Sequence, residues 1–223
     1  MNSRFRGMKK AVKFGAAAVL LAQTVGLAGA AHAEDVVAAA KAAVAKYAGP
    51  QTTWEGPTTA PTPQNGKKIV FLSGDEQNDI SHEYGVYMQQ AAEKLGWTVT
   101  VIDGKGSPTS WLAGFNQAIA LKPDGIAIFA DATSLKDPIA AANKAGIKVI
   151  GLHAASLPGP QPDLGLFVNI QEDPREIGAA QADWAIADSD GKARVVVLTH
   201  NEYKIAETKA DATRDQLKKC TTC

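Results

Sequence analysis

Polar side chains follow an apolar run in the first half of the chain, and their types suit the binding of a small polar molecule. The run 69–72 is followed by Asp75, Gln77 and Asn78. Carboxylates accept hydrogen bonds and amides both accept and donate them, so this group suits the hydroxyls of a sugar-like ligand. The alternative is structural, because Asn78 or Asp79 would also serve as the N-cap of a helix that begins near residue 80.

Two later apolar runs end in a similar way. Asp131 and Thr133 follow one of them, and His153 ends the next. If the runs are parallel strands, their ends meet at one edge of the sheet, where open α/β sheets bind ligands. The alternatives are a helix cap supplied by Thr133 or Ser134, and an ordinary surface histidine at His153.

A further apolar run, 195–199, precedes a polar loop that contains Tyr203. A tyrosine ring is able to stack on the face of a sugar. An exposed loop aromatic is the alternative interpretation.

Catalytic patterns are missing from the sequence. It contains no G-x-S-x-G nucleophile motif and no phosphate-binding P-loop. His82, His153 and His200 do not have the spacing of metal ligands. We therefore expect a binding protein that is not an enzyme, with no cofactor and no metal.

Apolar strand patterns alternate with helical patterns over most of the chain. Strands are expected at 68–74, 97–104, 125–130, 148–154, 166–170 and 193–200. Helices are expected at 80–95, 109–121, 135–145, 175–187 and 205–219, and a Pro- and Gly-rich loop at 157–165. This alternation predicts an α/β fold with a doubly wound parallel sheet, and near-continuous apolar strands predict helices on both of its faces.

The N-terminal residues 1–33 have the pattern of a secretory signal peptide. Five basic residues precede an apolar stretch, and Ala31-His32-Ala33 is a small-x-small cleavage site. A membrane anchor is the alternative, although the apolar stretch is short and interrupted for a spanning helix. Residues 34–66 are expected to form a helix and then a linker that contains four prolines.

Removal of the signal peptide would change the charge balance. The whole chain has 23 basic and 23 acidic residues, and residues 1–33 hold five of the basic ones and none of the acidic ones. The remaining chain would have 18 basic and 23 acidic residues, a net charge of −5. This balance gives no support for a nucleic-acid partner.

The two cysteines, Cys220 and Cys223, lie close together in the sequence C-T-T-C. In an oxidising compartment this spacing favours a local disulfide. A zinc site would need a second pair, and a catalytic redox pair would need a helix N-terminus after it to stabilise a thiolate.

The order of these motifs resembles the type I periplasmic sugar-binding proteins, the solute receptors of ABC importers of the ribose-binding kind. The resemblance covers residues 67 to about 220 and is carried by Asn78 after the first strand, by "ALKPDGI" and "AGIKVIGL", and by "FVNI" before a helix. It implies the type I periplasmic binding protein fold, with two α/β lobes that close on a ligand.

The resemblance also implies a division of the chain. The first lobe would span 67–168 and the second would begin at 169, with 169–223 only its start, so the chain is expected to be truncated. Asn169 and Gln171 would belong to a hinge crossing, and Lys209 would lie near the basic residue that faces the family's pocket.

The sequence departs from the family pattern at two places. Sugar binders of this kind often have aromatic residues after Asn78, where this chain has Ile80 and Ser81. They often have an Asp-Arg pair where this chain has His153 and Ala154. A simple copy of the ribose site is therefore not expected, and the identity of the ligand is left open.

The resulting hypothesis is a periplasmic solute-binding protein that delivers a small polar ligand, a sugar or similar compound, to an ABC permease. The alternatives are a ligand-sensing module for a chemoreceptor or kinase and, third, a periplasmic enzyme of doubly wound fold. Apolar surface left exposed between residues 175 and 200 is expected to make the chain unstable or prone to aggregation.

Overall fold

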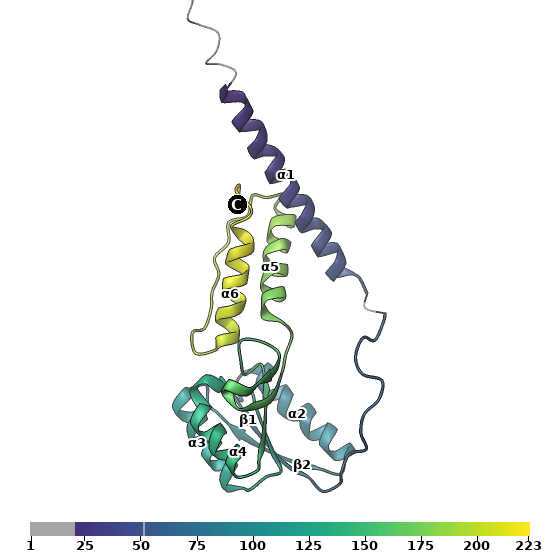
Figure 1. Cartoon of the computed structure of the whole chain (residues 1–223), viewed down its shortest axis with the longest axis vertical. Helices are drawn as coiled ribbons and strands as arrows, with labels where there is room; N and C mark the ends of the chain where they lie inside the picture. The colour runs from purple at the N-terminus through teal and green to yellow at the C-terminus, as the bar shows by residue number, and fades with distance from the viewer. Residues whose placement is uncertain (1–20, 51) are drawn as a thin grey trace, which may run out of the picture.

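Residues 68–170 fold around one twisted sheet with helices on both of its faces, and the helices nearest the two ends of the described chain pack against one another away from it (Figure 1). The computed structural model describes residues 21–50 and 52–223, with the side chains of 34–50 and 52–223. The sheet has six strands in the order β2-β1-β3-β4-β6-β5. The strands are β1 (Lys68–Ser73), β2 (Thr98–Asp103), β3 (Gly125–Ile128), β4 (Lys148–Leu152), β5 (Gly159–Gln161) and β6 (Leu166–Ile170).

Helices alternate with these strands along the chain. The α-helices are α1 (Leu21–Ala48), α2 (Asp79–Lys94), α3 (Pro108–Ala120), α4 (Lys136–Lys144), α5 (Pro174–Asp188) and α6 (Lys204–Leu217). Two short 3₁₀ helices are η1 (Ala132–Leu135) and η2 (Pro162–Leu164). Residues 1–20 of the predicted signal peptide lie outside the described residues. None of the helices in the described part of the chain has the length and apolarity that a membrane span requires.

Alternate residues of each strand pack against different helices, as the period of a β-strand requires. Val70 and Leu72 of β1 belong to the main core together with residues of α3 and α4. Phe71, between them, belongs to a smaller cluster on the opposite face, with Tyr84 and Met88 of α2 packed against it. Figure 1 shows α3 and α4 on one side of the sheet and α2 on the other.

The predicted parallel α/β sheet is confirmed. Strands β1, β2, β3, β4 and β6 pair in parallel. The short strand β5 was not predicted, because Gly159 and Pro160 are typical of a loop. It pairs antiparallel with β6 at the edge of the sheet, and an edge is the place where a strand tolerates proline.

The strand predicted at 193–200 is wrong. This segment runs without regular secondary structure between α5 and α6. Val196 is 85% exposed and Leu198 is 90% exposed. An apolar, β-branched sequence makes a strand only where a neighbour supplies hydrogen bonds and buries its side chains, and within the described residues no strand is paired with it.

The double substitution Val196→Thr with Leu198→Ser is expected to reduce aggregation without lowering the melting temperature. Both side chains are exposed, so their replacement removes apolar surface and disturbs no packing. Light scattering during a thermal ramp measures aggregation, and circular dichroism during the same ramp measures the melting temperature. The control is Val149→Thr in β4, whose side chain is buried and whose replacement should lower the melting temperature. Equal aggregation of the double variant and the wild type would contradict the prediction.

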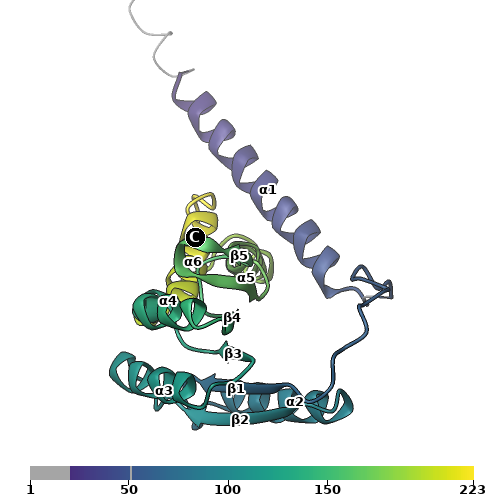
Figure 2. The ribbon, with the colours of Figure 1, turned by 60° about the horizontal axis from the view of Figure 1, so that its bottom comes forward.

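The N-terminal helix packs against the C-terminal part of the chain. Ala40 of α1, Ile186 of α5 and Cys220 form a small buried cluster, and Lys41 pairs with Asp190 at 2.5 Å. Cys220 is joined to Cys223 by a disulfide. From α1 the linker runs to the edge of the sheet near β2 (Figure 2).

Candidate functional site

The carboxyl ends of β3 and β4 and the N-terminal half of α6 line an open cavity of about 300 Å³. Phe129 and His153 line it from the ends of β3 and β4. The facing wall comes from the segment before α6, from α6 itself and from one residue of α5; these are Gln181, Val197, Leu198, Thr199, His200, Tyr203, Ile205, Ala206, Lys209, Ala210 and Thr213. Of the residues that the sequence singles out as candidate ligand contacts, His153, Tyr203 and Lys209 are brought together here.

A carboxylate that sequence analysis missed joins two of these three residues. Glu172 lies between β6 and α5, and its Oε2 is 2.8 Å from His153 Nε2. Its other oxygen, Oε1, is 3.5 Å from Lys209 Nζ. The His153 backbone is in the left-handed region, with a φ of 54°. The His153 ring also makes edge contacts with the rings of Tyr84 and Phe129. Glu172 therefore fixes the direction of two donors at the rim of the cavity.

These contacts set the protonation state of Glu172. Partial burial raises the pKa of this carboxyl, but its hydrogen bonds, one of them with His153, and the charges of His153 and Lys209 outweigh burial, so the pKa lies below its ordinary value of 4.5. A lowered pKa in the folded state adds stability above the ordinary pKa, and that stability is lost as the pH falls through the folded pKa.

Replacement of Glu172 by Gln is expected to make the protein less sensitive to acid. The wild type should lose more stability than the variant between pH 7 and about pH 3, because the amide at position 172 of the variant takes up no proton, whereas the Glu172 carboxylate does. Urea unfolding at a series of pH values measures the difference. Glu83→Gln, on the exposed surface of α2, is the control. Parallel pH profiles of wild type and Glu172→Gln would contradict the assignment.

Tyr203 closes one end of the cavity. Its ring lies 5.1 Å from that of Trp111, which is fully buried. Its hydroxyl lies against Gly74, where an added Cβ would come within 3.3 Å of the oxygen. Burial raises the pKa of the Tyr203 phenol, and the charges of Asp75, Asp131 and Glu202 raise it further. The hydroxyl thus stays protonated and remains able to donate a hydrogen bond.

The polar group after β1 does not line the cavity. Asn78 is the N-cap of α2 and accepts a hydrogen bond from the Ser81 backbone N–H at 3.1 Å, as the structural alternative predicts. Asp75 accepts from the backbone N–H of Gln77 at 2.9 Å, and the Gln77 side chain is exposed. Ligand contact by these three residues stays a prediction.

Asp131 and Thr133 are engaged with each other. Asp131 is 2% exposed. Its Oδ1 accepts hydrogen bonds from the backbone N–H of Thr133 at 2.9 Å and from the Thr133 hydroxyl. Its Oδ2 accepts from the backbone N–H of Lys204 at 2.6 Å, at the beginning of α6. Neither Asp131 nor Thr133 lines the cavity, and contact with a ligand remains a prediction for both.

The two residues predicted to form a hinge lie near the end of β6 and at the start of the crossing to α5. Asn169 is buried, and its side chain accepts from the Ala154 N–H at 3.0 Å and donates to the Leu157 carbonyl at 2.8 Å. It also donates to Gln171 Oε1 at 2.7 Å. Asn169 therefore anchors the loop after β4. A hinge role for Asn169 and Gln171 stays a prediction.

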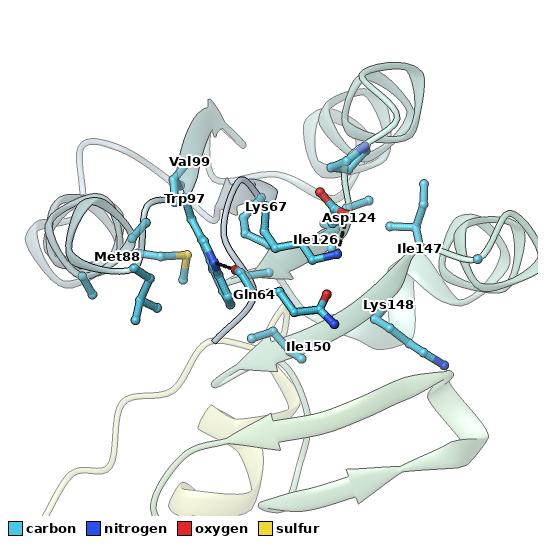
Figure 3. Close-up of a pocket in the computed structure, with 18 of the residues that line it drawn as sticks. Gln64, Lys67, Met88, Trp97, Val99, Asp124, Ile126, Ile147, Lys148 and Ile150 are labelled. Carbon is cyan, nitrogen blue, oxygen red and sulfur yellow. Dashed lines mark hydrogen bonds and ion pairs between the residues drawn. The ribbon is translucent and has the colours of Figure 1, made fainter. Parts of the chain in front are cut away.

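A larger hollow of about 800 Å³ lies away from all of these residues (Figure 3). It opens on the α2 side of the sheet, between Met88, Trp97 and Ile150, and the ion pair of Lys67 and Asp124 lies at its edge. Its lining is mainly aliphatic side chains. Polar groups that would orient a ligand converge at the smaller cavity, which is therefore the candidate site. Among the described residues, no cluster of three or more His, Cys, Asp or Glu side chains offers a metal site.

Comparison with solved structures identifies the fold. A sugar ABC transporter protein from Yersinia enterocolitica superposes with a TM-score of 0.62 at 24% identity, over 74% of this chain and 51% of that one. An ABC sugar transporter subunit from Rhodobacter sphaeroides gives a TM-score of 0.61 at 21% identity, over 70% and 54%. An ABC transporter solute-binding protein from Agrobacterium vitis, solved with bound allitol, gives 0.57 at 22% identity, over 69% and 50%.

The chain spans about half the length of these structures. Comparison with curated proteins gives no significant sequence match. The family of the periplasmic binding protein domain matches residues 69–220, which include the whole sheet except its first residue and both walls of the cavity. The chain belongs to the periplasmic binding protein family, as its resemblance to the type I solute receptors predicted.

Proposed function

We propose that the protein is a secreted solute-binding protein that captures a small polar ligand, a sugar or a polyol, and delivers it to an ABC transporter. The first lobe would be residues 67–168, and the second would begin at 169. Residues 1–33 would direct secretion and be cleaved, and the protein would act in the periplasm without chemical change of the ligand.

The cavity at the carboxyl edge of the sheet carries this proposal. Its two walls come from parts of the chain that the crossing at 171–173 connects, so a ligand in it would touch both. Contacts to both walls would favour the conformation in which the walls lie together, and this is the differential affinity that a closing receptor needs.

The lining supports a hydroxylated ligand. Lys209 offers polar hydrogen atoms, and His153 offers the ring nitrogen that does not face Glu172. Gln181 and Thr213 offer groups that both donate and accept, and the rings of Phe129 and Tyr203 offer flat apolar faces. The solved relative from Agrobacterium vitis carries allitol, a polyol. Aromatic faces combined with charged and amide groups match the alternating C–H and O–H surfaces of such molecules.

A thermal-shift screen of sugars, polyols, amino acids and nucleosides tests the proposal. For a hit, Lys209→Met should weaken binding about 10- to 100-fold, because it removes the Nζ donor but keeps most of the stem. Lys218→Met, on the same helix but paired with Asp215 at the surface, should leave affinity unchanged. If Lys209→Met and Lys218→Met bind a stabilising compound with equal affinity, this cavity is not its binding site. If only amino acids or nucleosides stabilise the protein, its ligand is not a sugar or a polyol.

A further inference from the structure

The helix that forms one wall of the cavity lacks an N-terminal cap of its own. Tyr203 occupies the N-cap position of α6, and its side chain makes no capping hydrogen bond. The first backbone N–H groups of a helix have no partner within the helix, so they need one from elsewhere. For Lys204, the first residue of α6, that partner is Asp131, which follows strand β3 of the sheet.

Both oxygens of the Asp131 carboxylate accept hydrogen bonds in this arrangement. One oxygen holds Thr133 within its own loop, and the other accepts the Lys204 N–H at 2.6 Å across a sequence separation of 73 residues. At 2% exposure the charge has little access to water. The partial positive charge at the N-terminus of α6 compensates it, and a hydrogen bond from a backbone N–H to a carboxylate is among the stronger kinds.

We propose that Asp131 is a latch residue, which caps α6 from the sheet and so favours the conformation in which the two walls of the cavity lie together. This inference rests on the proposed function for its purpose. The hydrogen bond itself needs no ligand. If the two walls separate, the Asp131 carboxylate loses the Lys204 N–H as its donor, and that N–H loses its acceptor. Asp131 is thus a positioning residue that acts through α6 on Tyr203 and Lys209.

Hydrogen exchange of the Lys204 amide in the ligand-free protein, followed by NMR, tests the latch directly. Asp131→Asn replaces one acceptor oxygen by an NH₂ donor, so it cannot satisfy both Thr133 and Lys204. We expect the Lys204 amide to exchange about tenfold faster, the effect of one charge-assisted hydrogen bond, while amides of β1 and β3 are unaffected. Ser134→Ala removes a hydroxyl that bonds the Asp131 carbonyl in the same loop and should leave the Lys204 amide unchanged.

A second pair of variants removes the donor instead of the acceptor. Lys204→Pro deletes the N–H, and proline is well tolerated at the first position of a helix. Tyr203 has a φ of −118° and a ψ of 115°, in the extended region, so its backbone accepts a following proline. Lys204→Ala keeps the N–H but loses the side-chain pair with Glu207, and it is the matched control.

For a ligand identified by the screen, Lys204→Pro and Asp131→Asn should each weaken binding about tenfold, and the double variant should weaken it no further. Lys204→Ala should bind as the wild type does. An unchanged Lys204 exchange rate in Asp131→Asn, or equal losses in the proline and alanine variants, would overturn the latch. Should the screen give no ligand, the exchange measurement still decides, so failure of the latch and failure of the proposed function are distinguishable.

Discussion

Replacement of Trp111 by alanine is expected to lower the free energy of unfolding by about 3–5 kcal/mol. Trp111 is fully buried in the main core. Its Nε1–H donates to the Gly74 carbonyl at 2.8 Å, at the end of β1. Truncation would leave a cavity under Tyr203 and would leave that carbonyl without this donor.

Trp111→Phe separates the two contributions. It keeps an aromatic ring in the core but removes the N–H, so a cost of about 1–3 kcal/mol is expected. Chemical denaturation with equal m-values gives both free energies. The Trp111 and Tyr203 rings are in contact, so Trp111→Ala should also weaken ligand binding. A decrease of less than about 1.5 kcal/mol in the free energy of unfolding of Trp111→Ala would contradict the burial of the Trp111 side chain in the core.

The strands of the sheet could be predicted from sequence because a strand that is buried on both faces consists of a continuous run of apolar residues. β3 (Gly125–Ile128) and β4 (Lys148–Leu152) are apolar runs bounded by polar or turn residues, and the structure places both within two residues of the prediction. The run at 193–200 has the same local pattern and is not a strand. A strand forms only where a neighbouring strand supplies hydrogen bonds, so the apolar pattern alone could not distinguish β3 and β4 from the run at 193–200.

The candidate site was only partly predictable for a related reason. His153 and Tyr203 were found because they follow apolar runs, and Lys209 because of the family resemblance. Glu172 lies in a short connection with no pattern, and its contacts with His153 and Lys209 exist only in the folded chain. The role of Asp131 toward Lys204 depends on a backbone N–H, which no side-chain motif reports.

The sequence also permitted two roles for the same residue type. Asn78 follows a strand and precedes a helix, so it fits both a ligand contact and a cap. The structure shows the cap, with Ser81 as its partner, and an amide oxygen already bonded within its own turn offers less to a ligand. Residues at strand ends in this chain therefore divide between helix capping, as at Asn78, and lining of the cavity, as at His153.

Gly178→Ala is expected to destabilise the pair of α5 and α6 and to abolish ligand binding, although alanine favours a helix over glycine by about 1 kcal/mol. At Gly178 in α5, an added Cβ would meet the Lys209 carbonyl oxygen at 2.3 Å and the Ala212 Cβ at 2.9 Å. These atoms belong to the backbone and first side-chain carbon of α6, so they yield only if the two helices separate. Overpacking of this kind costs about 1–3 kcal/mol.

The same substitution elsewhere in the chain provides the control. Gly85 in α2 is buried too, but there an added Cβ would meet ring and methyl atoms of Phe71 and Val101 at 3.3–3.4 Å. Those side chains adjust by small rotations, so Gly85→Ala should be close to neutral in melting temperature and in affinity.

Separation of α5 from α6 moves Lys209 away from Glu172, and with it one wall of the cavity. Gly178→Ala should therefore lose binding even at temperatures where it remains folded, and isothermal titration of both variants with the same ligand measures this. Retained affinity in Gly178→Ala would mean that the cavity does not depend on the close approach of the two helices.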